Sequence, residues 1–193
     1  MNLMFAPLIG AAVGAMAAAL YGLTGPVAVV IFWTAVPLVL GEPYLGGKNR
    51  SWWSRIGIAV ALFSEWLLLP MAVSAHDVLT VCIATQVVPR AAAVALAWVS
   101  RPAANPPSYT QSLTSTGALV AVAQGVAVAI WSGWLAGIFI LVACYLVTRG
   151  MRAWAYRSNG GVNHAWLVYA RLAMEVCVLL VLSVPLRAVS PKF

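Results

Sequence analysis

The stretch Gly41–Arg55 reads Gly-Glu-Pro-Tyr-Leu-Gly-Gly-Lys-Asn-Arg-Ser-Trp-Trp-Ser-Arg and lies between two long apolar segments. It contains three of the chain's eleven Lys and Arg residues, Lys48, Arg50 and Arg55, and two adjacent tryptophans. Basic residues at the end of an apolar span mark the cytoplasmic side of a membrane, and Trp side chains favour the headgroup level. This stretch therefore predicts a cytoplasmic loop that fixes the orientation of the spans on either side.

The composition of the whole chain indicates an integral membrane protein. Hydrophobic residues make up 63% of the 193 residues and charged residues only 8%, whereas soluble domains average about 25% charged residues. So few charged side chains do not cover the surface of a water-soluble core of this size. We expect a single transmembrane domain over residues 1–193, in the inner (cytoplasmic) membrane of a bacterium and in contact with its lipids.

Apolar runs close to the length of about 20 residues that a spanning helix needs recur along the chain. They predict an all-α polytopic bundle of seven transmembrane helices, or six. The expected spans are Leu3–Leu23, Val27–Leu40, Ile56–Val73, Val78–Val99, Leu113–Ile130, Trp134–Val147 and Ala165–Leu186. In the first span, Gly10 and Gly14 form a GxxxG spacing that permits close approach of another helix.

The basic residues alternate between the connections in a way that sets the topology. Three of the six predicted loops hold Lys or Arg, and the three loops between them hold none; the residues are Lys48, Arg50, Arg55, Arg101, Arg149, Arg152 and Arg157. The positive-inside rule then places the N-terminus in the cytoplasm. The same rule explains the net charge of +7 without a nucleic-acid partner, and we expect none.

Metal and disulfide sites are not predicted. Cys82, Cys144 and Cys177 all lie inside apolar spans without a CxxC spacing, which is typical of small buried hydrophobic residues. His76 and His164 lie in or beside loops, and neither has a second ligand-type residue at metal-binding spacing.

Four ionisable residues fall inside the predicted spans. An isolated charge near the bilayer centre costs about 2.5–3.5 kcal/mol on insertion scales, so such residues normally face a partner or water. Arg171 and Glu175 are four residues apart and can pair on one helix face, and Glu65 and Arg90 are the natural second pair, on adjacent spans. The four residues form either a polar pocket or proton path, or two ion pairs that lock helices together; we favour the ion pairs.

Several segments resemble the cobalamin-5′-phosphate synthase family, the membrane-embedded adenosylcobinamide-GDP ribazoletransferases. Phe5–Ala15 is similar to the family's early FPLIGxxxGA segment, and Val88–Ala93 is similar to its Ser-Arg helix. Gly160-Gly161 followed by Arg171–Leu182 resembles its closing GGxTGDxxGAxxExxE helix. The order of the segments also agrees. The resemblance implies a helical membrane scaffold and, in complete members, a transferase that uses a divalent cation.

The chain departs from that family at the residues expected to hold the cation. The resemblance implies an aspartate-rich DGxADxxDG motif after the second span, but the corresponding Gly46–Trp53 contains no acid. In the closing helix, Ala165 and Leu172 replace an Asp and a Glu, which leaves Glu175. The family's N-terminal cytoplasmic segment has no counterpart. Since clustered carboxylates hold Mg²⁺ in such sites, we expect no metal site and no catalytic residues.

Three function hypotheses follow. We favour a non-catalytic accessory or structural subunit of a larger membrane complex, a pseudoenzyme on a ribazoletransferase-like scaffold, with bound lipid and no identified cofactor. Lys48, Arg50 and Arg55 would then contact phosphate or lipid headgroups as point charges. The alternative is a divergent ribazoletransferase of cobalamin biosynthesis that depends on Glu42. Transport of a small solute through a pocket at the four intramembrane charges is the third.

Overall fold

The computed structural model describes residues 5–39, 52–102 and 113–184, and these residues form an all-α structure. They contain seven helices and no strand, apart from an isolated bridge between Pro102 and Val162. The helices are α1 (Ala6–Thr24), α2 (Pro26–Val39), α3 (Trp52–Ala75), α4 (Val78–Val99), α6 (Ser115–Trp131), α7 (Trp134–Asn159) and α8 (His164–Ser183). The predicted fold class, an all-α helical bundle, is confirmed.

Five of these helices are long and apolar enough to cross a membrane, namely α1, α3, α4, α7 and α8. Helix α6 is apolar but has 17 residues, somewhat fewer than the roughly 20 that a span perpendicular to the bilayer needs. Large hydrophobic side chains are exposed along the bundle, among them Ile31, Phe63 and Leu146. Exposed apolar side chains of this kind fit a membrane protein, and a total of six or seven spans stays a prediction.

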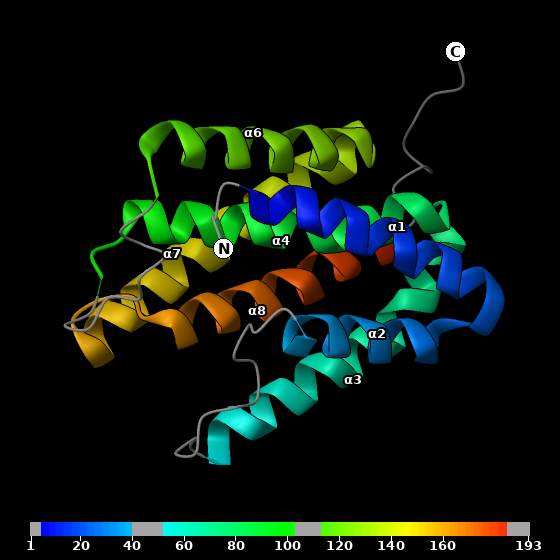
Figure 1. Ribbon diagram of the computed structural model, residues 1–193, viewed down its shortest axis with the longest axis horizontal. Helices are drawn as coiled ribbons and strands as arrows, with labels where there is room; N and C mark the ends of the chain where they lie inside the picture. The colour runs from blue at the N-terminus through cyan, green and yellow to red at the C-terminus, as the bar shows by residue number, and fades with distance from the viewer. Residues whose placement is uncertain (1–4, 40–51, 103–112, 185–193) are drawn as a thin grey trace.

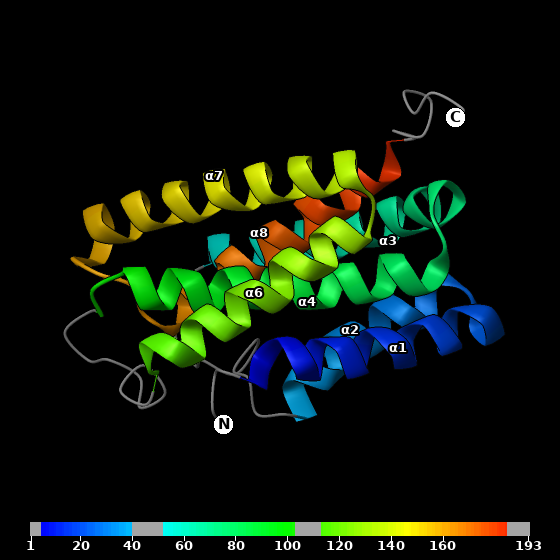
Figure 2. The same ribbon diagram turned by 90° about the horizontal axis from the view of Figure 1, so that it is seen from above.

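Helix α4 lies at the centre of the bundle. It packs against α1, α6 and α8, and Figures 1 and 2 show these three helices arranged around it. Its bounds are those predicted, because the carboxylate of Asp77 accepts hydrogen bonds from the backbone N–H groups of Leu79 and Thr80 at 3.0 Å and so caps the first turn.

Small residues allow the helices around α4 to approach it closely. A Cβ atom built on Gly10 would lie 2.5 Å from the backbone oxygen of Gln86, and one built on Gly14 would lie 2.7 Å from that of Cys82. On the other side of α4, a Cβ on Gly125 of α6 would lie 2.4 Å from the Cβ of Ala91. The GxxxG spacing in α1 therefore has the packing role that the sequence predicts.

Helix α7 is longer than predicted. The sequence predicts a basic loop from Arg149 onward. In the structure the helix continues past Arg149, Arg152 and Arg157 to Asn159, and it ends where Gly160 adopts a left-handed conformation with φ of +68°. The reason is that the segment after Val147 is mostly Arg, Met, Ala and Trp, which favour or tolerate helix, and contains no proline; the single glycine before Gly160, Gly150, is accommodated inside the helix.

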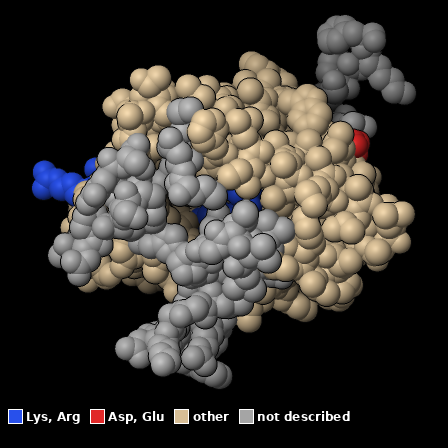
Figure 3. Space-filling model, in the orientation of Figure 1, with Lys and Arg blue, Asp and Glu red and all other residues tan. Residues whose placement is uncertain are grey.

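The exposed arginines of the described residues lie at one end of the bundle, here called the basic end. Arg101, Arg149 and Arg157 are exposed and Arg152 is half-buried. The ends of α4 and α7 meet there, because the backbone N–H of Arg101 donates to the Tyr156 hydroxyl at 2.6 Å. Figure 3 shows blue side chains protruding at the left edge of the bundle, a little blue in the middle of the visible face, and a red side chain at the right edge. Arginines gathered at one end of the helices are the pattern that the positive-inside rule describes.

Candidate functional site: a buried polar cluster

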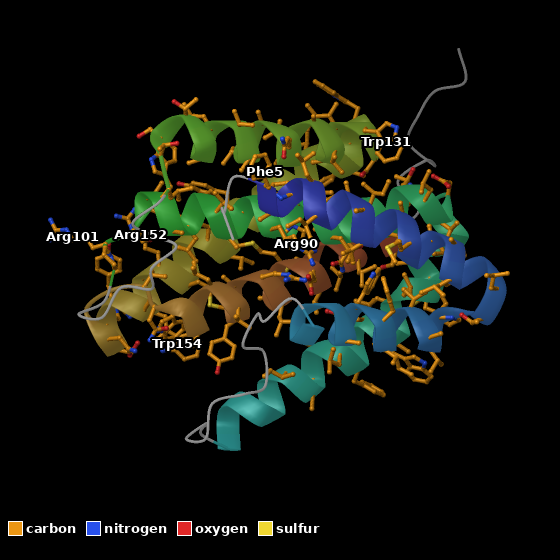
Figure 4. All side chains as sticks on the ribbon, in the orientation of Figure 1. Phe5, Arg90, Arg101, Trp131, Arg152 and Trp154 are labelled. Carbon is orange, nitrogen blue, oxygen red and sulfur yellow. The ribbon has the colours of Figure 1, made fainter. Side chains whose placement is uncertain are left out.

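The interior of the bundle contains charged and amide side chains from three helices. Glu65 of α3, Gln86 and Arg90 of α4, and Arg171 and Glu175 of α8 are each at most 6% exposed. Figure 4 places Arg90 in the middle of the bundle, far from both ends. Buried charges of this kind are stable only when they are paired and hydrogen-bonded, so the partners of each residue define what the cluster can do.

Arg171 and Glu175 form the ion pair that the sequence predicts. The Nε atom of Arg171 lies 2.7 Å from Oε1 of Glu175, one helical turn away on α8. Positions i and i+4 face the same side of a helix, and both side chains are buried. The pair is therefore confirmed, and it is local to α8.

Glu65 does not pair with Arg90 as predicted. Its carboxyl group lies near Glu175 and Arg171, close enough for the charges of both residues to act on it. The reason is the path of the chain: α3 and α4 diverge from their shared turn (Figure 1), and α3 packs mainly against α8. Adjacency in sequence therefore gives the wrong partner for Glu65.

Arg90 is held by its own helix. Its Nη1 atom donates to the backbone oxygen of Gln86 at 2.7 Å and also to the side-chain Oε1 of Gln86. Gly10 of α1 leaves room for this arrangement, because a Cβ there would lie 3.1 Å from Cδ of Arg90. Sequence analysis missed Gln86, although its spacing of four residues from Arg90 repeats that of Arg171 and Glu175.

The cluster retains unused hydrogen-bonding capacity. Within the described part of the chain, Oε1 of Glu65 and Nε2 of Gln86 are buried and have no hydrogen-bonding partner. One is an acceptor and the other a donor. The arrangement is thus an internal ion pair on α8 with a second carboxyl group from α3 near it. The buried interior also contains a hydrogen-bonded Arg90–Gln86 pair on α4, which lies against Gly10 of α1.

The remaining predicted residues lie elsewhere. Glu42, Lys48 and Arg50 are outside the described residues, and Arg55 lies in the first turns of α3, where its side chain is also outside the described part. The cysteines Cys82, Cys144 and Cys177 are free thiols. Among the residues that the structure describes, no group of three or more His, Cys, Asp or Glu side chains is placed to hold a metal ion.

Comparison with known proteins identifies no relative of this chain. No protein-family model, curated protein or solved structure matches the chain.

Replacing Glu65 by glutamine tests the role of its carboxyl group. The amide removes one of two neighbouring acidic groups and supplies an N–H donor for Glu175, so we expect the free energy of unfolding to change by less than about 1 kcal/mol. Glu175→Gln, in contrast, breaks the pair with Arg171 and should cost about 3 kcal/mol or more. Unfolding of the detergent-solubilised protein in sodium dodecyl sulfate measures both. Equal losses for the two variants would show that Glu65, too, is needed as a charged partner.

Proposed function

We propose that the protein is a non-catalytic, membrane-embedded accessory subunit of a larger membrane protein complex, on a scaffold that resembles the ribazoletransferases. The observation that carries this proposal is the use of the acidic residues. The chain has four acids. Asp77 caps α4, Glu175 pairs with Arg171, and Glu65 lies against Glu175. Three of the four therefore serve the packing of the bundle.

The resemblance to the ribazoletransferases implies a cation held by clustered carboxylates at one aqueous face. Asp77 lies at the start of α4, and the basic end is at the other terminus of that helix. Glu65 and Glu175 are buried inside the bundle. Only Glu42 is left for such a site, whereas the resembled family is expected to hold its cation on a cluster of aspartates.

The surface of the bundle supports a role among other membrane components. The outward side of α7 exposes Trp134, Phe139, Tyr145 and Trp154, and helix faces of this composition pack against lipid or against other transmembrane helices. We also propose that the basic end faces the cytoplasm of a bacterial cell. Helix α1 then begins on the cytoplasmic side, since Gly10 packs near Gln86 and Gly14 near Cys82, which makes α1 antiparallel to α4.

Purification of the native protein in a mild detergent, followed by mass spectrometry of what remains bound, tests the accessory role. We expect the same membrane proteins to co-purify in fixed stoichiometry, and the chain to lose abundance in cells that lack them. A protein that purifies alone or only as a homo-oligomer, and that is stable without partners, would contradict the proposal.

The second candidate is a divergent ribazoletransferase, and one observation favours it. Glu175 is the acid that the chain shares with the closing helix of that family, and it lies beside a second carboxyl group, Glu65. The purified protein should then transfer a ribazole phosphate to GDP-activated cobinamide in the presence of Mg²⁺, and Glu42→Gln should abolish the transfer. Absence of turnover from a folded wild-type protein would exclude this candidate.

A further inference from the structure

An apolar groove opens between α4, α6 and α7, away from the buried polar cluster. Helices α6 and α7 are held together beside their shared turn, where a Cβ on Gly137 would lie 2.5 Å from the backbone oxygen of Ala129. From that turn the two helices diverge (Figure 2). The space between them and α4 is a cavity of about 340 Å³.

The groove has an apolar floor and a basic mouth. Its floor is formed by small or aliphatic side chains of three helices, including Ala92, Ala95 and Val122. Arg149 and Arg152 line its outer part, together with the hydroxyl-bearing Thr148. The two arginines are three residues apart and so share one face of α7. No acidic side chain among the described residues lines the groove.

The length of the groove matches one leaflet of a membrane. It follows α4 from Val88 to Val99, which is roughly 16 Å at about 1.5 Å per residue. The hydrocarbon core of a bilayer is about 30 Å thick, so one leaflet contributes about 15 Å. The groove therefore runs from the middle of the bundle to the basic end, where lipid headgroups would lie.

The side chain of Arg152 is held in place by contacts within the protein. Its guanidinium carbon lies 5.5 Å from the centre of the Tyr156 ring, and the Tyr156 hydroxyl accepts a hydrogen bond from the backbone of Arg101 at the end of α4. Figure 4 shows Arg101 and Arg152 near each other at the same end of the bundle. This aromatic contact orients the guanidinium at the mouth of the groove, between α7 and α4.

The geometry points to a binding site for one anionic phospholipid, with an acyl chain in the groove between α4, α6 and α7 and the phosphate group on Arg149 and Arg152. The apolar floor accepts the chain. The two positive charges, beside which no acidic side chain of the described residues lines the groove, select an acidic headgroup over a zwitterionic one. The site uses none of the headgroup contacts predicted from the sequence, Lys48, Arg50 and Arg55, and it does not depend on whether the protein is an accessory subunit or an enzyme.

Titration of the delipidated protein in dodecyl maltoside with dioleoyl phosphatidylglycerol, followed by native mass spectrometry, tests the site. We expect one tightly bound lipid per chain and weaker binding of dioleoyl phosphatidylcholine. Each basic residue near an anionic group changes affinity about fivefold, so Arg149→Gln with Arg152→Gln should weaken phosphatidylglycerol binding about 25-fold. The matched control is Arg101→Gln with Arg157→Gln, which removes two exposed charges from the same end but not from the groove, and it should bind as the wild type does.

A second variant pair tests the acyl-chain part of the groove independently. Ala92→Leu with Ala95→Leu fills the floor, and both positions are partly exposed, so the protein has room for the larger side chains. We expect these variants to lose the bound lipid while retaining wild-type thermal stability. Equal affinity for both lipids, unchanged binding in the arginine or leucine variants, or a co-purified protein helix seated in the groove would each overturn the proposal.

Discussion

Replacement of Arg171 by methionine is expected to destabilise the protein by about 3–5 kcal/mol, which is the usual cost of removing one partner from a buried ion pair. Arg171 is 6% exposed and its Nε atom is 2.7 Å from Glu175. Its charge also acts on Glu65. Methionine fills a similar volume but leaves two neighbouring carboxyl groups in the interior without this base. The change should therefore weaken the contact between α3 and α8 as well as α8 itself.

Unfolding in sodium dodecyl sulfate can be followed by reaction of a maleimide dye with the buried thiols of Cys82 and Cys144. Arg157→Met is the matched control: this residue is exposed near the end of α7, and the expected change is within about 0.5 kcal/mol. The triple variant Arg171→Met, Glu175→Gln, Glu65→Gln should recover much of the lost stability, because no charge of the α3–α8 contact is then left unpaired. If the triple variant is no more stable than Arg171→Met alone, the loss comes from packing and not from the charges.

Replacement of Gly14 by alanine is expected to cost about 1–3 kcal/mol, the range found when a methyl group is forced into a close-packed interface. Its Cβ would lie 2.7 Å from both the backbone oxygen of Cys82 and the Cα of Ile83. These are backbone atoms of α4, so no side-chain rotation relieves the contact, and α1 must move away from α4. Leucine at this position should separate the two helices more strongly.

Gly22 provides an internal control on the same helix. A Cβ built there meets nothing within 4 Å, and alanine is the better helix former, so Gly22→Ala should stabilise the protein by up to about 1 kcal/mol. The same unfolding titration compares the two variants. A loss at Gly22 as large as that at Gly14 would mean that helix α1 requires glycine for a reason other than its contact with α4.

Much of the fold follows from the sequence because membrane helices are marked by local features. The bounds of α4 follow from an apolar run that begins at the capping Asp77 and ends before Arg101. The end of α7 does not follow, because arginines beside apolar residues suggest a loop on charge grounds while their helix propensity permits a helix. The helix ends only at Gly160, where the backbone takes a left-handed conformation.

The polar cluster was predictable only where it is local. The pairing of Arg171 with Glu175 depends on spacing within one helix, so the sequence predicts it directly. The position of Glu65 depends on which helix lies beside α3, and that is decided by the packing of side chains far apart in sequence. The apolar groove between α4, α6 and α7 could not be predicted either, since its floor and mouth come together only in the folded bundle.

The contact between Glu65 and Glu175 also bears on how the chain is made. During synthesis α3 leaves the ribosome well before α8, so Glu65 enters the translocation machinery when the helix that will cover it does not yet exist. A glutamate that faces lipid raises the free energy of the inserted helix. Insertion machinery that retains α3 until α8 arrives would keep Glu65 out of contact with lipid. Ribosome-bound intermediates that stop before residue 164 should therefore crosslink to the insertase through α3, and release of α3 should coincide with the arrival of α8.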